Sequence, residues 1–139
     1  MNRAILLLII VIIVSCNKIA PAGFWKNFDS KHIIENISDQ GPWGGQLIIR
    51  WKKSTGLYNV SDVLRFASHN GWKLIESKPV HSMTGYNDLS KMWITNSGIL
   101  YKFDSKWVKV DADTSKTAYG YLLISSDKTQ MSIYHQWGE

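Results

Sequence analysis

Histidines are the residues of this chain best suited to acid–base catalysis or metal binding, because the imidazole group titrates near neutral pH. His81 opens a loop-like stretch, HSMTGYNDLS, that also contains Asp88, and His135 falls on the apolar face of a predicted strand. A metal or acid–base site built from His81 and His135 is therefore one hypothesis. The alternative is that His135 is a packing residue, which is the more common role of a histidine on an apolar strand face.

Other catalytic signatures are missing from the sequence. It has no G-x-S-x-G elbow, no phosphate-binding glycine loop, no H-E-x-x-H pair and no C-x-x-C pair. Asp62 and His69 share one face of a predicted helix, but that face is opposite the apolar stripe and is expected to be solvated. No acidic pair has a spacing that indicates a glycosidase. The sequence therefore predicts a protein that is not an enzyme and that carries no cofactor or metal.

An apolar run at the N-terminus has the layout of a secretory signal. Residues 4–14 are all apolar, follow the single positive charge of Arg3 and give way at once to polar residues. A membrane-spanning helix needs about 20 such residues, so this run is too short to cross a bilayer. We expect residues 1–15 to be a cleaved signal peptide.

The only cysteine of the chain stands where this run ends. The stretch IVSC, ending at Cys16, resembles the lipobox of bacterial lipoproteins. The resemblance implies that the Cys16 thiol receives a diacylglyceryl group, and that two or more acyl chains then anchor the protein stably in a membrane. Asn17 follows, where an Asp would favour retention at the inner membrane of enteric bacteria. In a Gram-negative host the resemblance therefore implies an outer-membrane lipoprotein that faces the periplasm.

The charge of the chain argues against nucleic acid as a partner. The formal net charge is +5, and the basic residues are spread along the sequence without a basic block. With Cys16 committed to lipid, no cysteine remains for disulfides, so the folded part must depend on its hydrophobic core. A mild positive charge is compatible with an acidic envelope protein as partner.

The chain after the signal peptide is predicted to consist of two parts, a tether and a folded domain. Residues 16–40 are predicted to be a lipidated tether, in which Ile33, Ile34 and Ile37 have the spacing of a short amphipathic helix. The turn sequence GPWGG then opens a single domain over residues 41–139.

The domain is predicted to be α+β, with a mostly antiparallel sheet and one amphipathic helix, residues 60–70, packed on one face. Asn59 is placed to cap this helix, Tyr58 and Val63 to form a hydrophobic staple, and Gly71 to end it. The strand-like segments are QLIIRWKK, WKLIESKPV, KMWITN, GILYKF, KWVKVD, AYGYLLIS and TQMSIYHQW. NSG, DSK and SDK between the later segments have the composition of hairpin turns.

Tryptophan is unusually abundant, with 7 in the chain. Most are expected to fill the core, but an exposed Trp beside lysines is typical of binding surfaces. The candidate binding residues are Trp43, Trp107, Lys102, Lys106 and Lys109. Two functions remain open: an envelope lipoprotein that binds another protein in an immunity, exclusion or accessory role, or a module that binds glycan or peptidoglycan.

Overall fold

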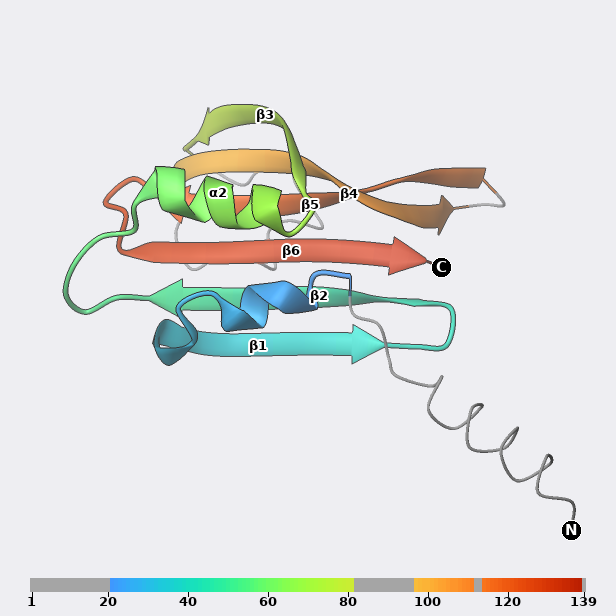
Figure 1. The fold of residues 1–139 in the computed structure, drawn as a ribbon, viewed down its shortest axis with the longest axis horizontal. Helices are drawn as coiled ribbons and strands as arrows, with labels where there is room; N and C mark the ends of the chain where they lie inside the picture. Colours follow the sequence, from blue (N-terminus) through green and yellow to red (C-terminus); the bar gives the residue numbers. More distant parts are fainter. Residues whose placement is uncertain (1–20, 82–96, 112–113, 139) are drawn as a thin grey trace, which may run out of the picture.

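The computed structural model describes residues 21–81, 97–111 and 114–138 (Figure 1). Two short 3₁₀ helices and one α-helix accompany six strands in this part of the chain. The elements are η1 (Gly23–Asn27), η2 (Ser30–His32), β1 (Ile33–Gln40), β2 (Gly44–Lys52), α2 (Val60–His69), β3 (Lys73–Val80), β4 (Gly98–Asp111), β5 (Thr114–Ser125) and β6 (Gln130–Gly138).

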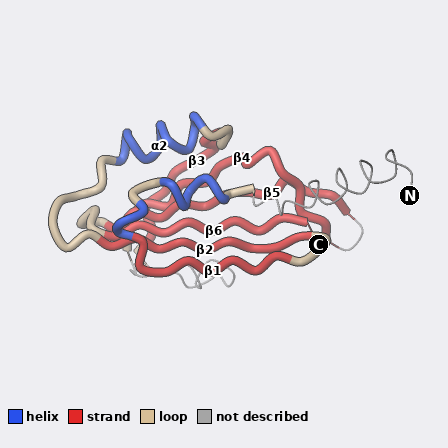
Figure 2. Tube along the Cα trace, turned by 60° about the horizontal axis from the view of Figure 1, so that its bottom comes forward, coloured by secondary structure: helices blue, strands red, loops and turns tan. Residues whose placement is uncertain are grey.

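The strands form one sheet in the order β1-β2-β6-β5-β4-β3, with antiparallel neighbours throughout. One extra parallel bridge joins Lys109 of β4 to Gly138 of β6. η1 and α2 lie over the same face of the sheet (Figure 2). The α+β prediction is confirmed in its broad form, although the sheet dominates the fold.

The predicted helix is confirmed as α2, which ends at His69, one residue before the expected end. The Asn59 side chain accepts hydrogen bonds from the backbone N–H groups of Ser61 and Asp62 and so caps the first turn. Val63 is fully buried against the sheet. Gly71 has φ +89°, a left-handed conformation that terminates the helix at low cost only for glycine.

Aromatic rings fill the core between the helices and the sheet. Trp25 of η1 lies 5.7 Å from Trp72 and 6.2 Å from Trp51, measured between ring centroids. All three indoles are buried, as the composition predicts. Gly120 makes room for Trp72, because a Cβ atom at this position would collide with the indole ring.

The prediction that residues 16–40 form a tether is wrong for residues 21–40, which are part of the folded unit. The isoleucines expected on a helix belong to β1, which is an edge strand paired with β2 over its full length. Trp25 is completely buried, and Phe28 accepts a hydrogen bond through its backbone carbonyl from the Trp51 indole N–H at 2.8 Å. The folded unit therefore includes residues before the GPWGG turn.

The predicted hairpin at DSK is also wrong. β4 continues through this segment, and Ser105 and Lys106 form a bulge without cross-strand partners. The Asp104 carboxylate accepts the Lys106 backbone N–H at 2.8 Å, while Lys106 takes a left-handed φ of 65°. Asp can therefore stabilise a local bend inside a strand as well as a turn between strands.

The other predicted turns have different outcomes. GPWGG joins β1 to β2, and SDK joins β5 to β6 with Asp127 accepting hydrogen bonds from Ser125 and Thr129. KMWITN, most of HSMTGYNDLS and the first residue of NSG lie outside the described residues.

Candidate functional site

His135 and Ser105 form a buried pair at the β4 bulge. The His135 Nε2 atom lies 2.8 Å from Ser105 Oγ, and the Ser105 hydroxyl donates to the backbone carbonyl of Ala118. Because that proton is directed to the carbonyl, Nε2–H must be the donor toward Ser105 Oγ. Histidine in this arrangement cannot act as a base toward the serine, so the pair holds the bulge in place and does not form a nucleophile.

The surroundings of His135 are apolar. Its ring stacks on Trp137 with a centroid distance of 5.5 Å, and the Trp72 ring lies at the same distance. Burial lowers the pKa of His135 to about 4, so the imidazole is neutral at physiological pH. Of the two sequence-based interpretations, the structure supports the packing residue.

The hypothesis of a joint site with His81 is wrong. His81 is exposed after the end of β3, at the level of Gly98 and Ser125, whereas His135 pairs with Gly120. Ser125 and Gly120 are separated along β5 by about 17 Å of strand rise, so the two imidazoles cannot share a metal or a proton. Within the described ranges no group of three or more His, Cys, Asp or Glu residues is placed to hold a metal ion.

Cys16 and the signal-like run lie outside the described residues. Among residues 21–81, 97–111 and 114–138, no helix is long and apolar enough to cross a membrane.

A polar cluster beside the end of β2 was not expected from the sequence. Asp29 lies 2.7 Å from His32 Nδ1 through Oδ1 and 3.8 Å from Lys53 Nζ through Oδ2. Lys53 Nζ also lies 4.4 Å from the centre of the Tyr58 ring. Burial and the neighbouring Asp29 carboxylate raise the pKa of the Tyr58 phenol. This cluster joins the N-terminal segment to the loop that follows β2.

The strand geometry separates two members of the predicted Trp–Lys patch, which consists of Trp107, Lys102, Lys106 and Lys109. Lys102 is directly opposite Tyr121, which packs on one face of the sheet, and Trp107 is opposite Ala118, which is buried on the face that carries the helices. The structure therefore places Lys102 and Trp107 on opposite faces of β4.

The three lysines of this patch have different partners. Lys102 Nζ lies 4.1 Å above the Tyr119 ring, and Lys109 Nζ donates to the Gln136 carboxamide oxygen at 3.0 Å. Both of these partners are neutral, but Lys102 is also directly opposite Glu76 of β3, so a carboxylate neighbours its positive charge. Lys106 Nζ lies 2.9 Å from the Asp104 carboxylate, whose pKa is lowered by hydrogen bonds from Lys106. That ion pair offsets the charge of Lys106.

β4 and β5 continue past the bulge as a two-stranded ribbon, residues 107–111 and 114–118 (Figure 1). Trp107 is 37% exposed and Val108 is 53% exposed. This ribbon contacts β6 through the bridge from Lys109 to Gly138 and through the hydrogen bond from Lys109 to Gln136. Two apolar side chains of the ribbon are therefore partly exposed to solvent.

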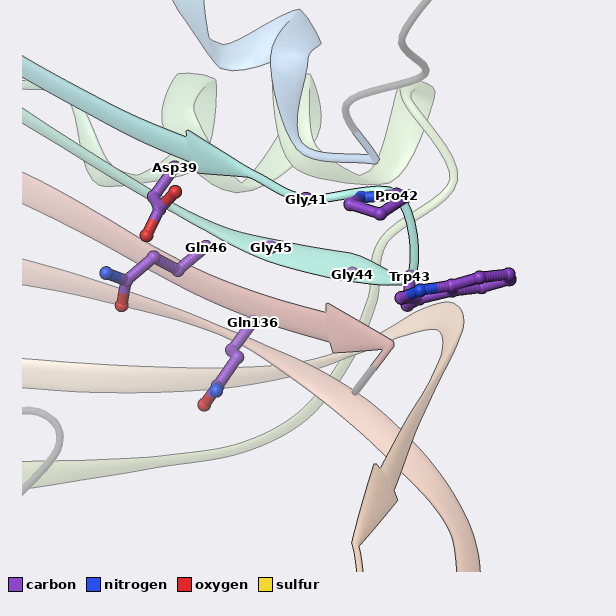
Figure 3. A pocket seen from close by; sticks show the side chains of 8 residues that line it. All are labelled: Asp39, Gly41, Pro42, Trp43, Gly44, Gly45, Gln46 and Gln136. Carbon is purple, nitrogen blue, oxygen red and sulfur yellow. The ribbon is translucent and has the colours of Figure 1, made fainter.

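Trp43 lies apart from the ribbon residues, at the tip of the β1–β2 hairpin, and is 77% exposed. An open pocket of about 400 Å³ adjoins it (Figure 3). The pocket is lined by Asp39, Gly41, Pro42, Trp43, Gly44, Gly45, Gln46 and Gln136.

The polar side chains of this pocket come from three adjacent strands. Asp39 of β1 is opposite Gln46 of β2, which in turn is opposite Gln136 of β6. Sequence reasoning identified Trp43 but missed these three residues. Alternation along each strand marks Gln46 and Gln136 as polar-face residues, but only the register between strands shows that they form a row.

No protein-family model, curated protein or solved structure was found that matches this chain.

Proposed function

We propose that this chain is a lipid-anchored protein of the bacterial cell envelope whose folded domain binds another protein, in an immunity, exclusion or accessory role. Cys16 is the proposed lipidation site, and the outer membrane, with the domain in the periplasm, is the proposed location. The proposal for the anchor rests on the lipobox-like stretch that ends at Cys16.

The observation that carries the binding function is the ribbon of residues 107–111 and 114–118. Exposed apolar side chains gain free energy when an interface buries them, and tryptophan is among the residue types most enriched at the energetic centres of interfaces. Trp107 and Val108 lie on opposite faces of the ribbon, since they are consecutive residues of one strand. A partner that contacts both faces of the ribbon would bury both side chains.

Charge gives this surface a preference for acidic partners. Lys109 lies in the ribbon, and its Nζ donates to a neutral group, the Gln136 carboxamide oxygen. Charged residues at the rim of an interface mainly raise the rate of encounter, while the buried apolar contacts determine how long the complex lasts. We therefore assign the anchoring role to Trp107 and Val108 and the steering role to Lys109.

Site-specific photo-crosslinking in the intact envelope tests this function. A photoreactive residue at position 108 should trap one defined envelope protein, and Trp107→Ala in the same chain should reduce the yield. Leu57, which is 61% exposed in the loop before α2, is the matched control position. Lys109→Glu should slow the trapping. If the photoreactive residue gave the same crosslinked products at positions 108 and 57, the result would argue against the ribbon as a binding surface.

A further inference from the structure

The pocket beside Trp43 has the chemistry of a saccharide site. Its polar lining consists of one carboxylate and two carboxamides, from Asp39, Gln46 and Gln136. These are planar groups that offer both acceptors and donors, as neighbouring sugar hydroxyls require. Figure 3 shows the three side chains extending to the same side of the hairpin and the adjoining β6 strand.

Hydrogen bonds fix the orientation of Gln136. Its Oε1 atom accepts from Lys109 Nζ and from the Tyr134 hydroxyl, each at 3.0 Å. Both acceptor positions of the carboxamide oxygen are thereby used, and the NH₂ group is left to donate to a ligand. Within the described residues, the side chains of Asp39 and Gln46 have no hydrogen-bond or ion-pair partner. The row therefore combines a preorganised donor with two groups available for a ligand.

Trp43 supplies the apolar part of the site. Its indole projects from the tip of the hairpin in Figure 3 and is the most exposed of the large apolar side chains in the described residues. The electron-rich face of an aromatic ring attracts polarised C–H groups, which line one face of a pyranose ring. Figure 3 shows the indole directed away from the three polar side chains, so the stacking surface and the polar row are separate parts of the site.

Glycines shape the floor of this pocket. A Cβ atom at Gly45 would collide with the Asp39 backbone carbonyl, so this position admits only glycine without a shift of β1. At Gly138, which has φ +70°, a Cβ atom would collide with the Trp43 carbonyl. The turn therefore sits directly on the end of β6, which fixes Trp43 relative to Gln136.

The lining also indicates the charge and length of the ligand. The single carboxylate disfavours an anionic ligand, and no lysine or arginine lines the pocket itself, although Lys109 Nζ donates to the lining residue Gln136. Gln46 and Trp43 are three residues apart, which corresponds to about 10 Å of extended chain. A ligand that contacts both must be longer than a single sugar ring. We propose that the hairpin pocket binds an uncharged oligosaccharide, with Trp43 stacking on one sugar and the Asp39–Gln46–Gln136 row binding the hydroxyl or amide groups of the next.

Calorimetry with defined tetrasaccharides tests this proposal. The full-length protein is kept in a detergent without a sugar headgroup and titrated with the tetramer of N-acetylglucosamine and, separately, with a tetramer of glucose. Binding of the first alone indicates an amino-sugar glycan such as a cell-wall strand, and binding of both indicates a general glucan site. Binding of neither by the wild-type protein overturns the proposal.

Variants at the pocket separate this site from other surfaces. Trp43→Ala and Gln46→Ala should each weaken binding by about tenfold, and Trp43→Phe should retain part of it because the ring remains. Trp107→Ala, on the ribbon, should bind as the wild type does. Circular dichroism checks the fold of each variant. Unchanged affinity in folded Trp43→Ala and Gln46→Ala would overturn the proposal, whereas failure of crosslinking at position 108 would leave it intact and count only against the protein-binding function.

Discussion

Burial of His135 should make the stability of the protein depend on acid pH. Its pKa is about 4 in the folded state and near 6.5 when the chain unfolds, so the unfolded state binds the proton more readily between these values. Above pH 6.5 His135 is neutral in both states and does not lower stability. As the pH falls from 6.5 toward 4, protonation of His135 in the unfolded state lowers the free energy of unfolding by about 3 kcal/mol in total. Denaturant unfolding measured across this range should show stability that decreases with pH.

His135→Phe is the matched variant for this measurement, because it keeps a flat ring between Trp72 and Trp137. Its stability should change less between pH 6.5 and pH 4 than that of the wild type. Equal slopes for the two proteins would show that other groups cause the acid sensitivity.

Gly120 is a position at which one added methyl group should lower the stability of the fold. An added Cβ atom would collide with the Trp72 ring, which is held between the helices and the sheet. Gly120→Ala should cost about 1–3 kcal/mol, the usual penalty for overpacking a core. Gly41→Ala is the control, because its new Cβ atom would meet only the Gly44 carbonyl at an ordinary 3.6 Å. Thermal unfolding that is equally affected in both variants would contradict the assigned role of Gly120.

Sequence patterns predict whether a residue is buried more reliably than they predict which residues it contacts. The packing role of His135 follows from its apolar strand face, and Trp51 and Trp72 follow from their positions in apolar segments. The hydrogen bond from His135 to Ser105 does not, since 30 residues separate the two. The Asp39–Gln46–Gln136 row is hidden for the same reason, because it depends on the register of three strands.

The N-terminal segment is the element whose role changes most between sequence and structure. Trp25 lies among Trp51, Trp72 and Phe66, and the Phe28 carbonyl accepts the Trp51 indole proton. Trp25→Ala should therefore cost about 3–5 kcal/mol, as expected for truncation of a buried aromatic side chain. Trp43→Ala, at an exposed indole, is the stability control.

A fragment that starts at residue 41 should be much less stable than the full protein. It lacks β1 and η1, so it exposes the β2 edge and part of the aromatic core. Denaturation curves of the two proteins provide the comparison. A fragment with the same unfolding midpoint would show that residues 21–40 are the dispensable tether that the sequence predicts.

Local patterns predict the helix and most strands because the signals lie within each element. The α2 stripe, its Asn59 cap and Gly71 all agree with one another. At Asp104 the same logic fails, because an Asp that accepts a nearby backbone N–H stabilises a bulge and a turn equally well. Ile33, Ile34 and Ile37 fit a helical spacing, but pairing with β2 overrides this local preference.

At the scale of the whole molecule, the two proposed binding surfaces lie toward the same end of the sheet. The β1–β2 hairpin, the C-terminus of β6 and the ribbon of β4 and β5 gather there (Figure 1). The opposite end carries the Asp29 polar cluster and the turn between β5 and β6. One protein could thus hold a saccharide at the hairpin and a protein partner at the ribbon, with β6 as the rigid connection.

The proposed anchor limits how far the domain can reach from the membrane. Cys16 precedes Pro21, the first described residue, by five positions, which span at most about 18 Å when fully extended. Cys16→Ser should abolish acylation and leave an uncleaved precursor, while Asn17→Gln, as control, should still be processed. Metabolic labelling with a fatty-acid analogue and detergent phase partitioning measure both steps. A Cys16→Ser protein that is cut before residue 16 and still enters the detergent phase would contradict the lipoprotein assignment, because no other cysteine thiol exists in this chain to carry the lipid.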